Sequence, residues 1–189
     1  MPKIGSEDSI AMIVGQDVGL MVRGFSAALQ DSQILVQRAA LDIVAATLRL
    51  DGVGFQKDTR SEEKLILMRV MTGVVLRRDL SLSRRLYGWL LGQAEDSDAQ
   101  VQYFKQNGLQ LLRQALVVEL VETTLDTEDL TAKQRPYKVI LSLLDKWEIS
   151  YPLTEVIVSD VLRALDKSSR DGELNDEVSI ALPLIYSYD

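Results

Sequence analysis

Residues 74–92 read VVLRRDLSLSRRLYGWLLG. The apolar residues at the start of this stretch indicate the end of one helix, and those in its second half indicate another helix, which Gly92 ends as a C-cap. Between the two helices lies a corner, Arg77–Asp79, and a second arginine pair follows it at Arg84 and Arg85. The stretch therefore predicts two apolar helices joined by a short, highly charged connection.

The rest of the chain has the same helical pattern. Residues 33–50 and 65–76 are apolar around most of a helix circumference, and a helix of that kind is covered on more than one side. Pro136 and Pro152 are each expected as the first residue of a helix. Thr59 with Glu62, and Ser97 with Gln100, have the spacing of a capping box. Besides residues 33–50 and 65–76, the expected helices span residues 16–29, 81–91, about 97–107, 109–124, 136–147 and 153–167.

About eight helices with short connections, and no strand pattern, predict an all-α fold. We expect an irregular α-solenoid of stacked helical pairs, of the armadillo or HEAT type, with an irregular bundle as the alternative. Residues 1–15 are expected to be a flexible lead-in and residues 16–170 to form the helical segment. Residues 171–189 form a tail that the pattern leaves open between a docked strand and a truncated helix.

Composition excludes several kinds of function. The net charge of −7 and the pI near 4.7 disfavour nucleic acid as a partner. The chain has no cysteine and no histidine, so it has no thiolate zinc site and lacks the usual general base. We therefore expect no metal, no cofactor and no enzymatic activity. No apolar run reaches the ~18 residues of a membrane span, which makes the cytoplasm the expected location.

The arginines around the corner have two interpretations. Arg77, Arg78, Arg84 and Arg85 near a helix N-terminus are suited to an anion, either a lipid headgroup phosphate or an acidic peptide. Alternatively they are paired within the fold, since unpaired charge is rarely buried. The acids available for such structural pairing are Asp79, Asp145 and Glu148, and we expect pairing for at least half of the arginines.

Trp147 stands beside alternating charges at a predicted helix end. A tryptophan in such a place can anchor a partner. More often it closes the core, because large aromatic side chains dominate packing energetics. We expect Trp147 in the core.

Four segments, taken in order, resemble the N-terminal domain of the Dopey family: residues 18–25, 34–42, 75–92 and 136–149. The resemblance covers about residues 16–165, and its most specific part is the Arg-Arg-Asp-Leu-Ser-Leu segment. The chain resembles fungal members more than animal ones. Dopey proteins are large peripheral scaffolds at the Golgi and endosomes, so the resemblance implies that this chain is a fragment without enzymatic activity. It also implies a Mon2-type scaffold as partner, together with flippase or motor components.

These expectations combine into one prediction of function. The chain is predicted to be a non-catalytic scaffold segment in traffic between endosomes and Golgi, peripheral on those membranes, that binds partner proteins. Arg77, Arg78, Arg84, Arg85 and Lys138 are the candidate patch for anionic phospholipid or a protein partner. The alternative is an armadillo-type peptide-binding adaptor without membrane contact.

Overall fold

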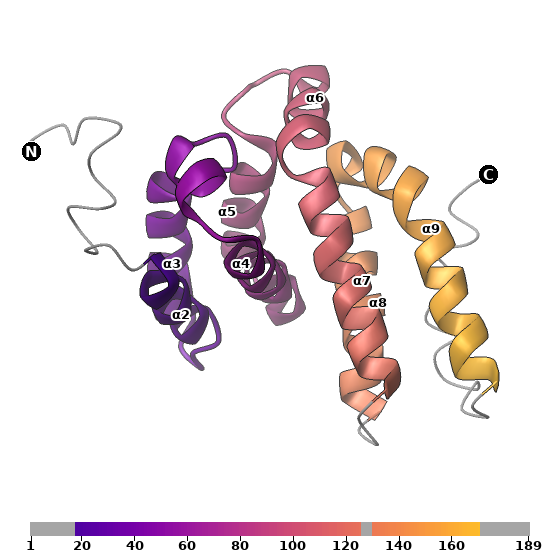
Figure 1. Ribbon diagram of the computed structural model, residues 1–189. Coiled ribbons are helices and arrows are strands. Elements are labelled where there is room, and N and C mark those ends of the chain that lie inside the picture. Colours follow the sequence, from indigo (N-terminus) through magenta and orange to yellow (C-terminus); the bar gives the residue numbers. More distant parts are fainter. Residues whose placement is uncertain (1–17, 126–129, 171–189) are drawn as a thin grey trace, which may run out of the picture. The chain divides into compact units, whose positions relative to one another are not determined.

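A computed structural model of the chain describes residues 18–125 and 130–170 (Figure 1). Within these ranges the chain forms eight α-helices, α2 to α9, and no β-strand. The predicted all-α class, built from stacked helical pairs, is confirmed. The expected lead-in at residues 1–15 and the tail at residues 171–189 lie outside the described residues. The helices fall into two compact units, residues 1–92 and residues 93–189, and each is described by itself.

The described part of the first unit, residues 18–92, holds four α-helices and two short helical turns. Helix α2 packs against both α3 and α4, and α3 also packs against α5. The core between them is almost entirely aliphatic, and it includes Leu41, Leu67 and Leu86, which are fully buried. The elements are α2 (Val18–Leu29), α3 (Ile34–Thr47), the π-helix η1 (Gly54–Asp58), α4 (Ser61–Gly73), the 3₁₀-helix η2 (Val74–Arg77) and α5 (Leu80–Leu91).

In the second unit, the described residues 93–125 and 130–170 form four helices in sequence. Helix α7 packs against α8 and α9, and α6 packs against α7 and α9. Leu112, Ile140 and Leu153 are fully buried in the core that these helices share. The elements are α6 (Ser97–Asn107), α7 (Leu109–Leu125), α8 (Leu130–Leu144) and α9 (Trp147–Arg170).

Two predicted helix starts are wrong by one residue. Helix α4 begins after Arg60, whose backbone N–H donates to Glu63 at 3.0 Å, while the hydroxyl of Thr59 donates to the Gly54 carbonyl instead. Helix α6 is capped by Asp96, whose carboxylate accepts from the Ala99 N–H at 2.8 Å. In both places an adjacent residue provides the cap, because neighbouring polar side chains compete for the same backbone groups.

The prediction that each of the two prolines is the first residue of a helix is also wrong. Pro136 lies inside α8 and Pro152 inside α9, not at their first residues. Helix α9 begins earlier because Glu148 and Ile149, just before the proline, are buried against the unit. The C-terminal end of α9 also differs from the prediction. A turn was expected from residue 168, but the helix continues to Arg170. Packing therefore outweighs the local preference of proline for the first helical position.

Each described helix falls short of the length or the apolar character that a bilayer-crossing helix requires.

Candidate functional site

The corner between η2 and α5 is stabilised by Asp79, which caps α5. Its carboxylate accepts from the Leu82 N–H at 2.9 Å and forms an ion pair with Arg38 of α3 at 3.1 Å. The bond from Leu82 is the main cause that lowers the pKa of Asp79, and Arg38 lowers it further against the opposing effect of partial burial. Because this carboxylate already occupies the helix N-terminus, an anion at the corner would have to be bound by arginine side chains.

Two of the four corner arginines are engaged within the fold. Arg85 forms an ion pair with Asp42 of α3 at 2.7 Å, and its guanidinium also donates to the Ser81 hydroxyl at 2.6 Å. Arg77 is exposed, but its guanidinium donates to the Asp31 carbonyl at 3.0 Å. These bonds join α5 and η2 to the helices that precede them, so Arg85 and Arg77 have a structural role.

The other two corner arginines are open to solvent. Arg78 follows η2 in the left-handed region, with φ 53°, and its side chain is exposed. Arg84 is exposed on α5. Neither side chain makes a hydrogen bond or an ion pair with a described residue. The corner therefore offers two guanidiniums, with Arg77 beside them, for an external anion.

The remaining predicted site residues belong to the second unit. Lys138 is exposed on α8, and Asp145 is exposed before α9, without a partner among the described residues. Glu148 is buried, accepts from the Ser97 hydroxyl at 2.7 Å and forms an ion pair with Lys146 at 2.7 Å. Asp79 and Glu148 thus both hold structural ion pairs, although neither has a corner arginine as its partner.

The two tryptophans lie in different environments. Trp89 is buried in the first unit, where its ring meets Phe55 edge-on and its indole N–H donates to the Leu48 carbonyl at 2.8 Å. Trp147 is 53% exposed, so the prediction that it closes the core is wrong. It is the first residue of α9, and only positions further along that helix turn toward the core.

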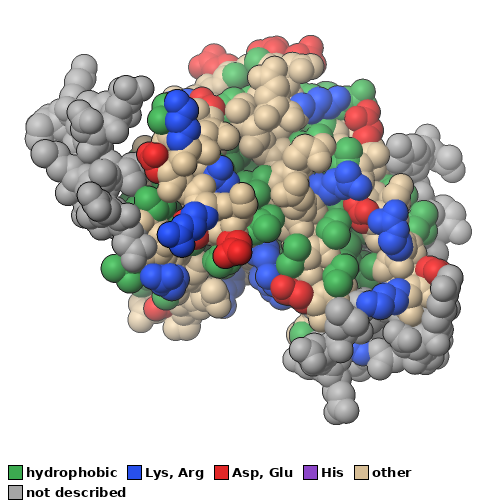
Figure 2. Space-filling model, in the orientation of Figure 1, with side chains coloured by type: hydrophobic (Ala, Val, Ile, Leu, Met, Phe, Trp, Pro, Cys, Tyr) green, Lys and Arg blue, Asp and Glu red, His purple; other side chains and the backbone are tan. Residues whose placement is uncertain are grey.

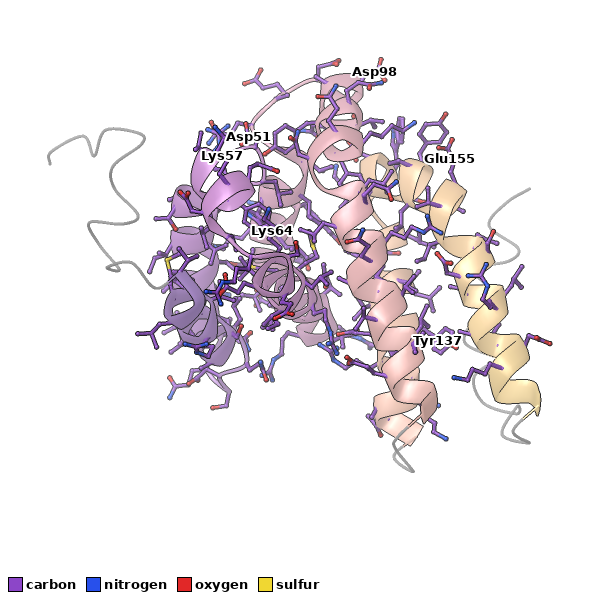
Figure 3. The ribbon with its side chains drawn as sticks, in the orientation of Figure 1. Asp51, Lys57, Lys64, Asp98, Tyr137 and Glu155 are labelled. Atoms are coloured by element: carbon purple, nitrogen blue, oxygen red, sulfur yellow. The ribbon has the colours of Figure 1, made fainter. Side chains whose placement is uncertain are left out.

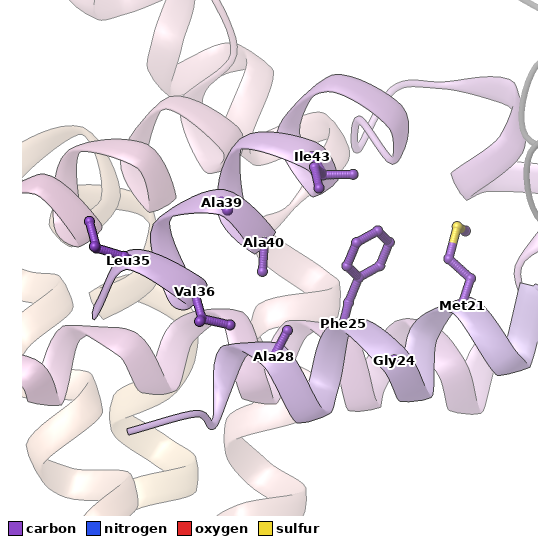
Figure 4. A pocket seen from close by; sticks show the side chains of 9 residues that line it. All are labelled: Met21, Gly24, Phe25, Ala28, Leu35, Val36, Ala39, Ala40 and Ile43. Carbon is purple, nitrogen blue, oxygen red and sulfur yellow. The ribbon is translucent and has the colours of Figure 1, made fainter. Parts of the chain in front are cut away.

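The first unit also has an apolar groove between α2 and α3, of about 620 Å³ (Figure 4). Phe25 and Met21 of α2 and Ile43 of α3 line it, together with alanines from both helices. Because its lining is almost wholly apolar, the groove contains no group that could perform acid–base chemistry. Within the described residues, no group of three or more acidic side chains is placed to bind a metal ion.

Charge is divided unequally between the two units. Residues 1–92 carry 12 Lys and Arg against 10 Asp and Glu, a net +2, whereas residues 93–189 carry 9 against 18, a net −9. Figure 2 shows acidic side chains gathered at the end of the second unit where α6 begins, and Figure 3 places Asp98 there. The acidic character of the whole chain therefore comes from its second unit, while the arginine corner lies in the first.

The two units coincide with two family models. Residues 3–95 match the model described as Dopey, N-terminal, and residues 103–181 match the model of the DOP1 middle TPR domain. The chain carries Dopey-family domains in both of its units. The expected resemblance to the Dopey N-terminal domain thus applies to the first unit, whereas the second unit matches a different domain of the same family.

Relatives in fungi and animals support this assignment. Over 83% of its own residues, the chain is 31% identical to Protein dop1 of Emericella nidulans. Over 88% of its own residues, it is 32% identical to Protein DOP1B of Xenopus laevis. It is 26% identical to Protein DOP1 of Saccharomyces cerevisiae over 88%. These identities do not support the expected preference for fungal members.

The Dopey-family chain spans only 10%, 8% and 10% of the length of these three relatives. No solved structure matches it.

Proposed function

We propose that this chain is a non-catalytic scaffold segment of a Dopey-type protein that works in membrane traffic between endosomes and Golgi. It acts as a peripheral component on those membranes. Its partners are proteins, with a Mon2-type scaffold and flippase or motor components as the candidates that the family resemblance suggests. Anionic phospholipid is a further candidate ligand, and its contact lies at the arginine corner.

The observation that carries the lipid contact is the exposure of Arg78 and Arg84 without partners among the described residues. Exposed guanidiniums bind phosphate with directed hydrogen bonds. Each basic residue near an anionic leaflet contributes about 1 kcal/mol to binding. The net positive charge of the first unit favours its approach to such a surface, whereas the second unit is repelled from it. Lys138 contributes only if its exposed side chain also meets the membrane.

Vesicle co-sedimentation at low salt tests the lipid contact. The wild-type chain should sediment with vesicles of phosphatidylcholine and phosphatidylserine, and not with phosphatidylcholine alone. The double variant Arg78→Glu/Arg84→Glu should bind at least about tenfold more weakly, because two basic contacts are replaced by repulsion. Arg85 is left unchanged because its ion pair with Asp42 supports the fold.

A matched control separates local contact from total charge. Lys57→Glu/Lys167→Glu makes the same change in net charge at two exposed positions away from the corner. This control variant should retain most of the vesicle binding. Both double variants should have the circular dichroism spectrum of the wild type. If the wild-type chain ignores anionic vesicles at low salt, or if the two doubles lose binding equally, the arginine corner is not the lipid contact.

The alternative, a peptide-binding adaptor without membrane contact, is favoured by one observation. Trp147 is exposed at the start of α9, where it is available to a peptide, although Trp89 is buried. Binding of peptide with no binding to anionic vesicles would favour this second function.

A further inference from the structure

Two aromatic side chains lie exposed, one helical turn apart, at the start of α9. Trp147 and Tyr151 are 53% and 54% exposed, and their rings meet edge-on with centroids 5.9 Å apart and an interplanar angle of 84°. The nitrogen of Lys105 lies 4.8 Å from the centroid of the Tyr151 ring. An edge-on contact covers at most one face of one ring, so a face of the Trp147 indole stays open. The indole N–H of Trp147 also has no partner among the described residues.

The first turn of α6, with its acidic residues, lies close to this aromatic pair. The Ser97 hydroxyl donates to the buried carboxylate of Glu148 at 2.7 Å, which ties the beginning of α6 to the beginning of α9. Glu95 and Asp98 lie within two residues of Ser97, and Trp147 directly precedes Glu148. The aromatic pair and these acidic residues therefore lie at neighbouring helix starts of the second unit, and we name this region the α6–α9 surface.

The α6–α9 surface carries an excess of negative charge. Its two lysines are already engaged, because Lys146 pairs with Glu148 at 2.7 Å and Lys105 with Glu155 at 3.8 Å. The carboxylates that no described cation neutralises are Glu95, Asp96, Asp98 and Asp145, all exposed. Of these only Asp96 is partly engaged, as the cap of α6.

We propose that the α6–α9 surface docks a basic, arginine-bearing peptide segment of a partner protein. An arginine of the partner stacks on the open face of Trp147, and its neighbours pair with Asp145 and with Glu95 or Asp98. Cations over indole rings and aromatic anchors at interface centres are recurrent features of such contacts. The site rests on the proposed scaffold function and deepens it, by naming one docking surface and the chemistry of its partner.

Charge separates this occupant from two others. An anionic membrane would repel the four carboxylates, although exposed aromatic residues alone would suit an interface. A second copy of the chain in a two-fold arrangement would set this acidic surface against itself, because residues 93–189 carry a net charge of −9. A basic segment is the partner whose charge complements this surface.

The test uses the 189-residue chain and a fluorescein-labelled peptide of alternating arginine and alanine, with a glutamate–alanine peptide as its acidic twin. Anisotropy should report binding of the basic peptide only, and binding should weaken with salt. Acrylamide quenches exposed tryptophan, so bound peptide should protect Trp147, while buried Trp89 contributes little to the change. Trp147→Ala should weaken binding at least about fivefold, as expected for loss of a cation–π contact.

Matched variants make the result specific. Leu162→Ala removes another exposed apolar side chain from the same helix, and it should bind as the wild type does. Glu95→Gln/Asp98→Asn should weaken binding at least about threefold more than Asp58→Asn/Glu62→Gln, which removes the same charge from the first unit.

Equal binding by wild type and Trp147→Ala, or equal effects of the two double variants, would overturn the proposal. So would protection of Trp147 by anionic vesicles or by self-association in place of the peptide. Because the arginine corner belongs to the other unit, failure of the vesicle test would leave this result unaffected.

Discussion

At the scale of single residues, Trp89 and Trp147 have the same side chain but contribute differently to the stability of the fold. The Trp89 indole donates to the Leu48 carbonyl, which is the backbone group that ends α3, and its ring packs against Phe55. The Trp147 side chain makes no hydrogen bond with a described residue and is half exposed. One tryptophan is therefore part of the core, and the other is available for contact.

Replacing each tryptophan by phenylalanine should give different losses of stability. Trp89→Phe leaves the Leu48 carbonyl without its donor, and we expect it to lower the free energy of unfolding by about 1–3 kcal/mol. Trp147→Phe should change it by less than about 0.5 kcal/mol, as is usual for surface substitutions. Urea unfolding followed by circular dichroism measures both values. Equal losses would contradict the assignment of Trp89 to the core.

The buried carboxylate of Glu148 should make stability depend on pH. Burial raises the pKa of Glu148, but hydrogen bonds from Lys146 and Ser97 outweigh it, so the pKa lies below its ordinary value of 4.5. A lowered pKa in the folded state means that the unfolded state binds protons first. The stabilisation from this group is therefore complete above pH 4.5 and is lost as the pH falls through the folded-state pKa.

Glu148→Gln should destabilise the chain by about 1–2 kcal/mol at pH 7, since it removes charge-assisted hydrogen bonds. The difference from the wild type should shrink as the pH falls below 4.5. Urea midpoints measured at a series of pH values give this comparison. The control Glu155→Gln, at an exposed glutamate of the same helix, should have little effect at any pH. A difference between Glu148→Gln and wild type that grows on acidification would refute the role given to Glu148.

At the scale of helices, the glycine inside α5 and the glycine that directly follows it have opposite roles. Gly88 lies inside α5, and a Cβ built there meets nothing within 4 Å. Gly92 ends the helix with φ 72°, a conformation that side chains with a Cβ rarely adopt. The first glycine lowers helix stability, whereas the second is required where the helix stops.

Substitution by alanine should therefore change stability in opposite directions. Gly88→Ala should raise the free energy of unfolding by about 0.5–1 kcal/mol, because it reduces the backbone entropy lost on folding. Gly92→Ala should lower it by about 1 kcal/mol or more, because of backbone strain. Thermal melts of the two variants against wild type provide the measurement. A stabilising Gly92→Ala would mean that α5 does not end in this conformation.

Helices were easier to predict from sequence than their ends. The stretch from Val74 to Gly92 correctly indicated a corner between two helices, with Gly92 as the stop. The starts of α8 and α9 were wrong because proline at a first helical position is only a local preference. Burial of Glu148 and Ile149, which extends α9 toward its N-terminus, depends on helices distant in the sequence.

At the scale of the whole molecule, the unequal charge of the two units predicts two separate binding surfaces. The basic arginine corner lies in residues 1–92, and the acidic α6–α9 surface lies in residues 93–189. Electrostatic complementarity selects partners of opposite sign for each. The two proposals together predict that an anion and a basic protein segment bind at the same time without competition for one site.

Hydrogen exchange measured at low salt should separate these surfaces. Anionic vesicles should slow exchange in η2 and at the start of α5, and the arginine–alanine peptide should slow it at the starts of α6 and α9. Phosphatidylcholine vesicles and the glutamate–alanine peptide are the controls, and neither should protect amides. Protection of the same amides by both ligands would show that the division of charge does not direct binding.

The sequence by itself determined the all-α class, the approximate number of helices, the corner at Arg77–Asp79 and the resemblance to Dopey proteins. These follow from apolar periodicity and from local residue order, which the chain carries without folding. The tertiary structure decided which charges are neutralised and which aromatic residue is exposed: Arg85 meets Asp42, Ser97 meets Glu148, and Trp147 remains at the surface. Those pairings join residues distant in the chain, so helix packing sets them and no local pattern reveals them.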